Sequence, residues 1–214
     1  MIKVGIELNH VVRNINKQIL KYYQKDIDPS LDLDDIDEKD NVFKYAKFET
    51  LTDKNEFIYI DYPYEIFGCA KTMSKELPSL LNNWLSELTN YEEDDVEISF
   101  FSLNEEALTI QSSYFFLSKI GTRVRKIVFP KNIEEMVGEY DVIVTSNKQV
   151  INHFAEDKNV YTVYIPTGSE SDLSKYDKEY DSLDDLIGDE SFLKGIQEFV
   201  NNKTEKNKEN GKSN

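Results

Sequence analysis

Five short apolar runs, separated by segments of helical period, limit what this 214-residue chain can fold into. Each run is largely apolar and rich in β-branched or aromatic residues. None shows the alternation of a strand with one face in water, so the runs are typical of parallel strands that are covered on both sides. They span residues 2–8, 96–102, 125–130, 141–147 and 160–166.

Helical segments lie between these runs, at residues 77–88, 104–121 and 132–140. Strand, helix and strand in repetition require crossover connections, which place helices on the faces of a parallel sheet. We therefore predict an α/β, Rossmann-like core of five mostly parallel strands with helices on both faces.

A segment after the first predicted helix does not fit this alternation. Residues 26–40 carry eight acidic side chains and one lysine, which predicts a solvated loop. The runs 42–51 and 56–68 predict two strands joined by a polar turn, and thus a small β-rich cap. The expected division of the chain is a core of residues 1–22 and 68–200, a cap insertion of residues 23–67 and a polar C-terminal tail of residues 201–214.

The charge of the chain excludes some classes of partner. There are 41 acidic and 25 basic residues, with a formal net charge of −16 at pH 7. This charge repels nucleic acid and anionic lipid, so we expect no direct nucleic-acid binding and no membrane partner. The sequence starts directly with a strand pattern and has no run of about 20 apolar residues. We predict neither a signal peptide nor a transmembrane segment.

Three polar residues lie at the end of the first apolar run or directly after it, in the stretch VGIELNHVVRN: Glu7, Asn9 and His10. In a doubly wound sheet, ligands bind beyond the carboxyl ends of the strands, near the point where the strand order switches. The first strand usually borders that point. We therefore expect these side chains to face a ligand crevice.

The strand order and the place of the insertion resemble the haloacid dehalogenase superfamily, and within it the 5′-nucleotidase-like branch. In that family the first strand ends in an Asp-x-Asp motif and a cap follows. The resemblance puts Glu7 at the position of the nucleophile and Asn9 at that of the general acid and base. The other implied motif residues are a hydroxyl residue, Ser102, and a lysine, Lys131, with Lys126 or Lys119 as weaker choices.

Several residues depart from the family's pattern. Glu7 is one methylene longer than aspartate, which moves the attacking oxygen by about 1 Å, and Asn9 cannot exchange a proton. The fourth run ends in Thr145, Ser146 and Asn147, where the family carries metal-binding aspartates. These neutral groups lack the anionic oxygens that Mg²⁺ prefers.

The departures predict a chain that is not an enzyme. The expected vestigial catalytic site consists of Glu7, Asn9, Ser102 and Lys131, and the vestigial metal position of Glu7, Asn9 and Asn147. We expect no cofactor, and Mg²⁺ only if the chain is active after all.

A second resemblance rests on longer strings of the sequence: PYEIFGCA, LNNWLSEL, SSYFFLSKIGTRVRKIVFP and YDVIVTSNKQVI. They are similar to haloacid-dehalogenase-like proteins of crAss-like bacteriophages, encoded near virion and tail components. The resemblance implies a catalytically inactive structural or assembly subunit of a virion, at the portal-to-tail neck. It also implies other protein subunits as partners, in a homo-oligomeric ring with neighbouring virion proteins, assembled in the host cytoplasm.

Two other functions remain open from the residues alone. One is a Mg²⁺-dependent phosphatase or 5′-nucleotidase in which Glu7 is the nucleophile. The other is a module that binds a nucleotide or phosphate without hydrolysing it, through Ser102, Lys131 and backbone amides of the first turn.

Overall fold

A computed structural model of the chain describes residues 2–36, 41–90, 96–157, 159–167, 176–192, 194–196 and 198–199. Within these residues, six strands form one parallel sheet in the order β5-β4-β1-β6-β7-β8. The strands are β1 (Ile2–Glu7), β4 (Val96–Phe101), β5 (Lys126–Val128), β6 (Val142–Thr145), β7 (Tyr161–Tyr164) and β8 (Lys178–Glu179).

The central strand β1 marks the point where the strand order reverses. From β1 the chain moves outward through β4 to β5, and then crosses to β6, β7 and β8 on the other side of β1. Ligand sites of doubly wound sheets form at such a switch point, beyond the carboxyl ends of the strands. Glu7, the last residue of β1, lies there.

Successive residues of the central strands point into two separate apolar cores. Phe100 and Val144 belong to the first core, whereas Phe101 and Ile143 belong to the second. The first core is completed by residues of α1 (Ile15–Asp26), α3 (Leu77–Asn90), α4 (Ala107–Ile120) and α6 (Leu183–Gly188), and the second by α5 (Lys148–Phe154) and the 3₁₀ helix η4 (Ile133–Met136). Because the two cores lie on opposite sides of the pleat, both faces of the sheet are covered.

Close packing explains a glycine in the middle of β1. A Cβ atom at Gly5 would lie 2.8 Å from the ring of Tyr140. The glycine therefore allows the tyrosine ring to lie directly against the central strand.

The expected fold class is confirmed. All five predicted strands are present, and the described residues add a sixth, β8, in which Lys178 pairs with Val163. The expected count of five was wrong because a two-residue strand is too short to leave an apolar run in the sequence.

The inserted segment is helical where a hairpin was expected. Residues 42–68 form the 3₁₀ helix η1 (Val42–Lys44), the α-helix α2 (Leu51–Glu56) and two single π-helical turns, η2 (Phe57–Asp61) and η3 (Tyr64–Gly68). The predicted polar turn is the first turn of α2. Thr50 Oγ1 accepts a hydrogen bond from the Asp53 N–H, and Asp53 Oδ2 accepts one from the Thr50 N–H. This capping box starts a helix, and its Thr-x-x-Asp spacing was a signal in the sequence.

A small antiparallel sheet accompanies the insertion but does not lie inside it. β2 (Arg13–Asn14) pairs with β3 (Lys71–Thr72), so the two strands close the base of the insertion. The division at residues 23 and 67 stays a prediction, and the tail from residue 201 onward lies outside the described residues.

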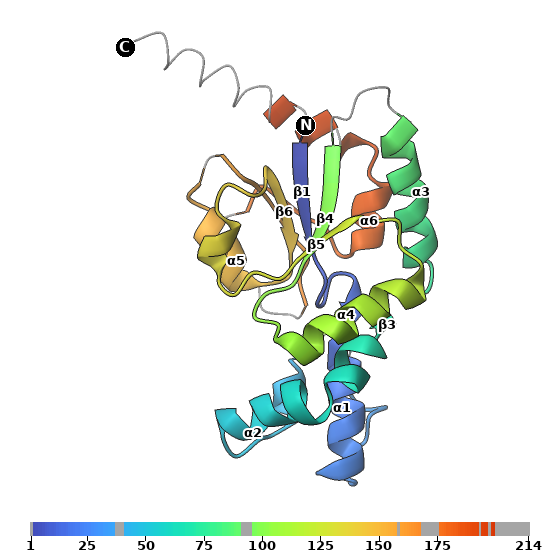
Figure 1. Ribbon diagram of the computed structural model, residues 1–214, viewed down its shortest axis with the longest axis vertical. Coiled ribbons are helices and arrows are strands. Elements are labelled where there is room, and N and C mark those ends of the chain that lie inside the picture. The colour runs from blue at the N-terminus through green and yellow to red at the C-terminus, as the bar shows by residue number, and fades with distance from the viewer. Residues whose placement is uncertain are drawn as a thin grey trace.

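Figure 1 shows how these parts are arranged. β1 starts at the N-terminus near the top. α1 and α2 lie at the opposite end of the molecule, beyond the carboxyl end of β1. The inserted segment thus stands over the end of the sheet that carries Glu7. No helix among the described residues combines the length and apolar character needed to cross a membrane.

Candidate functional site

The carboxylate of Glu7 is bound at the junction of β1 and β6. Its Oε2 atom accepts hydrogen bonds from Thr145 Oγ1 at 2.6 Å, from the Ser146 backbone N–H at 2.9 Å and from Ser146 Oγ at 3.1 Å. Only 5% of the Glu7 surface is exposed. The donors come from the end of β6 because β1 and β6 are hydrogen-bonded neighbours.

Burial raises the pKa of Glu7 above its ordinary value of 4.5, and the hydrogen bonds from Thr145 and Ser146 oppose this shift in part. Water solvates a carboxylate better than this interior does, so the folded state holds the proton more tightly than the unfolded chain does. The group is ionised more easily in the unfolded chain.

This shift predicts how the Glu7→Gln substitution changes stability with pH. The wild-type contribution of Glu7 to the free energy of unfolding is fully present below the ordinary pKa and falls as pH rises through the raised one, by up to about 1.4 kcal/mol per pH unit. Glutamine does not titrate, so the stability of Glu7→Gln relative to wild type should rise as the pH increases above 4.5, the ordinary pKa of the group. Urea unfolding at several pH values measures this difference. A difference that is constant or falls with pH would contradict the raised pKa.

Asn9 and Ser102 form the second part of the site. Asn9 Nδ2 donates a hydrogen bond to Ser102 Oγ at 3.0 Å, and Asn9 Oδ1 accepts one from Arg13 Nε at 2.8 Å. Ser102 follows β4, the other neighbour of β1, and is fully buried. The structure thus brings together two of the polar residues that the sequence placed at this site.

His10 adopts the left-handed conformation, with φ of 66°, and its backbone N–H donates to the Arg13 carbonyl. Burial and the nearby charge of Arg13 lower the pKa of His10 to about 4. The imidazole is therefore neutral at pH 7 and carries no extra proton that it could deliver as a general acid.

Asn147 and Lys131 serve other contacts. Asn147 Oδ1 accepts hydrogen bonds from the Gln149 and Val150 backbone N–H groups and so caps α5. Lys131 is exposed in the loop after β5, where its backbone N–H donates to Glu135. No contact described in the structure joins Lys131 to Glu7, Asn9 or Ser102.

The two alternative lysines lie away from Glu7. Lys119 Nζ, on α4, donates to the carbonyls of Gly68 and Ala70 and so ties α4 to the inserted segment. Lys126 Nζ, on β5, lies 3.7 Å from Glu97 Oε1. Both lysines therefore have structural contacts of their own.

The residues that hold Asn9 in place were not predicted from the sequence. Arg13 is 0% exposed and forms an ion pair with Glu105, with 2.5 Å between Nη2 and Oε1. The available signal was a single arginine directly after the two valines of HVVRNI, because a charged residue beside buried apolar residues is itself buried only when it is paired.

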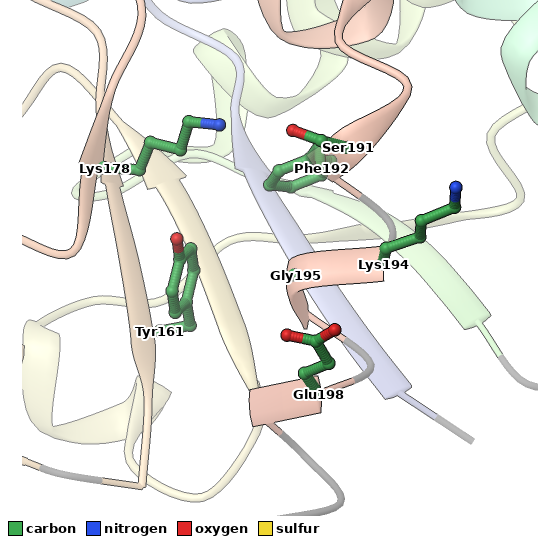
Figure 2. A pocket seen from close by; sticks show the side chains of 7 residues that line it. All are labelled: Tyr161, Lys178, Ser191, Phe192, Lys194, Gly195 and Glu198. Carbon is green, nitrogen blue, oxygen red and sulfur yellow. The ribbon is translucent and has the colours of Figure 1, made fainter.

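A pocket of about 380 Å³ lies at the other end of the sheet. Figure 2 shows Tyr161 and Lys178 on one side and Ser191 and Phe192 on the other, with Lys194, Gly195 and Glu198 completing the lining. Tyr161 is the first residue of β7, whereas Glu7 is the last residue of β1. In a parallel sheet these are opposite ends, so this pocket is separate from the Glu7 site.

Solved structures with the same fold are haloacid dehalogenase-like hydrolases. One from Bacteroides fragilis has a TM-score of 0.54 at 12% identity, covering 86% of this chain and 98% of that one. Another, from Burkholderia xenovorans LB400, has a TM-score of 0.53 at 8% identity, covering 89% and 96%. A subfamily IA hydrolase from Geobacter sulfurreducens has a TM-score of 0.52 at 15% identity, covering 88% and 98%. No protein-family model and no curated protein matches the sequence.

The chain therefore has the haloacid-dehalogenase-like fold. The prediction that it is not an enzyme is contradicted by this comparison, because these structures are all described as hydrolases. The prediction relied on single residues of the motifs and gave too little weight to the fold that holds Glu7 at the switch point.

Mg²⁺, which this fold family implies, does not fit the donors at the site. Asn9 Oδ1 already accepts from a guanidinium, and Asn147 Oδ1 caps a helix. No group of three His, Cys, Asp or Glu side chains able to hold a metal occurs in the part of the chain that the structure describes. A hard divalent cation needs more anionic oxygen than Glu7 alone provides.

Proposed function

We propose that this chain is a hydrolase in which the Glu7 carboxylate is the attacking group. The observation that carries the proposal is the position of Glu7 at the carboxyl end of the central strand, held through Oε2 by Thr145 and Ser146. Three donors on one oxygen fix the orientation of the carboxylate, which is what a nucleophile requires before attack. The hydrolase fold neighbours support the same class of reaction.

For a phosphate monoester the reaction has two steps. A Glu7 oxygen forms a bond to phosphorus as the bond from phosphorus to the ester oxygen breaks, and the leaving group departs with that electron pair. Water then attacks the acyl phosphate, which releases inorganic phosphate and a proton and restores the carboxylate. Asn9 and Ser102 lie on the β4 side of Glu7, where the half-buried Asn9 amide can orient an oxygen of the substrate.

Among the described residues at the site, neither Asn9 nor His10 can deliver a proton to the leaving oxygen. Asn9 cannot exchange protons, and His10 is neutral at pH 7 because its pKa is lowered to about 4. Substrates whose leaving group departs as a stable anion should therefore react faster than alkyl esters, by about 10²–10⁴-fold, the usual contribution of general acid catalysis.

The test compares p-nitrophenyl phosphate, whose nitrophenolate needs no proton, with deoxynucleoside monophosphates. Turnover by the purified full-length chain is measured by release of nitrophenol and phosphate. Faster turnover of the aryl ester supports the proposal. Equal rates for both esters would show that a proton donor is present, and no turnover of either would contradict phosphate esters as substrates.

A small 2-haloacid is a second candidate substrate, because its leaving group also needs no proton. Halide leaves as a stable anion, so displacement by Glu7 at the carbon that bears the halogen needs no proton donor. Water hydrolyses the resulting ester to a 2-hydroxy acid. Halide release from 2-chloropropionate tests this candidate in the same assay series.

The finer resemblances remain proposals beside this one. We retain the 5′-nucleotidase-like branch, the relation to crAss-like phage proteins and the virion location with other subunits as partners. Exposed apolar side chains support a protein contact, because Tyr64 and Phe115 are 46% and 43% exposed and their rings lie 5.1 Å apart. The native mass of the purified protein, by light scattering, tests the expected ring.

A further inference from the structure

Arg13 is a buried cation that contacts three parts of the molecule around the Glu7 site. Nη2 pairs with Glu105 Oε1, and Nη1 donates to the Phe67 carbonyl at 3.2 Å and to Ser113 Oγ at 2.8 Å. Nε donates to Asn9 Oδ1 at 2.8 Å. The guanidinium also lies 5.0 Å from the ring centroid of Phe67. Its four hydrogen-bond partners and its full burial fix its position.

The charge of Arg13 sets the direction of the hydrogen bonds at the site. A guanidinium has donors only, so Asn9 must present its Oδ1 atom to Arg13 and its Nδ2 atom to Ser102. Ser102 Oγ then accepts from Asn9, and its own proton points elsewhere. On the side away from Arg13, the Asn9 amide therefore presents N–H donors and not the oxygen acceptor that binds a cation.

The same charge acts against a divalent cation at Asn9. Glu105 pairs with Nη2, so the group nearest to Asn9 Oδ1 is the positive Nε–H end of the guanidinium. A cation on that oxygen would lie within a few ångströms of this group, inside a buried region where charges are poorly screened.

We propose that Arg13 is a positioning residue that stands in for a divalent cation at Asn9: it orients the Asn9 amide with its N–H donors toward Ser102, and it keeps a metal ion from binding there. This inference rests on the proposed hydrolase function. It implies that the reaction of the hydrolase does not require Mg²⁺. It concerns metal binding and hydrogen-bond direction, both of which can be measured without any turnover.

The test restores the missing carboxylate with and without Arg13. Mn²⁺ binding is measured by electron paramagnetic resonance on full-length wild type, on Asn9→Asp, and on Asn9→Asp in an Arg13→Gln/Glu105→Gln background, which removes one charge of each sign. Wild type and Asn9→Asp should bind Mn²⁺ no more tightly than about 1 mM, the weak end for protein sites of this kind. The triple variant should bind at least about tenfold more tightly, because the positive group that contacts residue 9 is gone, whereas the carboxylate lost with it paired with Nη2 and not with the Nε end.

Two results would overturn the proposal. One is Mn²⁺ binding by wild type or Asn9→Asp tighter than about 1 mM, and the other is a folded triple variant that binds no better than Asn9→Asp.

If the triple variant does not fold, ¹⁵N spectra of wild type and Asn9→Asp test whether Arg13 contacts residue 9. Of the three arginines, Arg123 and Arg125 are exposed, so Arg13 should give the one slowly exchanging Nε–H signal. The signal should persist and shift in Asn9→Asp, and its loss there would contradict an Arg13 contact with residue 9.

The outcomes for the hydrolase and for Arg13 are separable. Turnover that requires Mg²⁺ would overturn the role of Arg13 and leave Glu7 as a nucleophile. Absence of turnover, with the Mn²⁺ and Nε–H results as expected, would contradict the hydrolase and leave the role of Arg13 in place.

Discussion

Glu7→Gln should lower turnover of p-nitrophenyl phosphate to background, a loss on the order of 10⁴-fold in kcat. Glutamine keeps the size of the side chain, and its carbonyl oxygen can still accept from Thr145 and Ser146. The amide is not nucleophilic, so no covalent intermediate forms. Because Asn9 cannot exchange a proton and neutral His10 has no extra proton to deliver, we expect little residual activity.

Two controls make this loss interpretable. Glu134→Gln changes an exposed glutamate in η4 and should leave turnover unchanged. The pH dependence of stability shows whether Glu7→Gln is folded, since the relative stability of that variant should rise with pH. A folded Glu7→Gln protein with wild-type turnover would exclude Glu7 as the nucleophile.

Arg13→Ala should lower the free energy of unfolding by about 3–5 kcal/mol, the usual cost of breaking a buried ion pair by removing one partner. Glu105 would keep a negative charge in a site where its side chain is 1% exposed. Asn9 Oδ1 and the Phe67 carbonyl would also lose their donor. Urea unfolding near neutral pH measures the effect.

Arg123→Ala is the matched control, because Arg123 is exposed and its guanidinium contacts only Ser86 among the hydrogen bonds described. It should change stability by no more than about 0.5 kcal/mol. The Arg13→Gln/Glu105→Gln double variant should cost less than the sum of its single variants, since it leaves no unpaired charge. Additive losses would show that the two residues do not act as a pair.

The arrangement of the core was determined by local sequence patterns. Continuous apolar runs such as residues 2–8 and 160–166 can be satisfied only where both faces of a strand are covered, and helical segments between them require parallel crossovers. The position of Glu7 followed from the same pattern, because the end of the first strand is a fixed place in such a sheet. These inferences depend on residues that are close together in the chain.

The contacts around Glu7 were decided by the tertiary structure. Thr145 and Ser146 are 138 and 139 residues away from Glu7 in the sequence, and Glu105 is 92 residues away from Arg13. The aromatic pattern of residues 56–68 is compatible with a strand, but the Thr50 capping box and ring contacts such as that between Tyr23 and Phe57 stabilise helical turns instead. A hydrogen-bond partner, a buried ion pair and the direction in which Asn9 points all depend on residues that only folding brings together, so no local pattern specifies them.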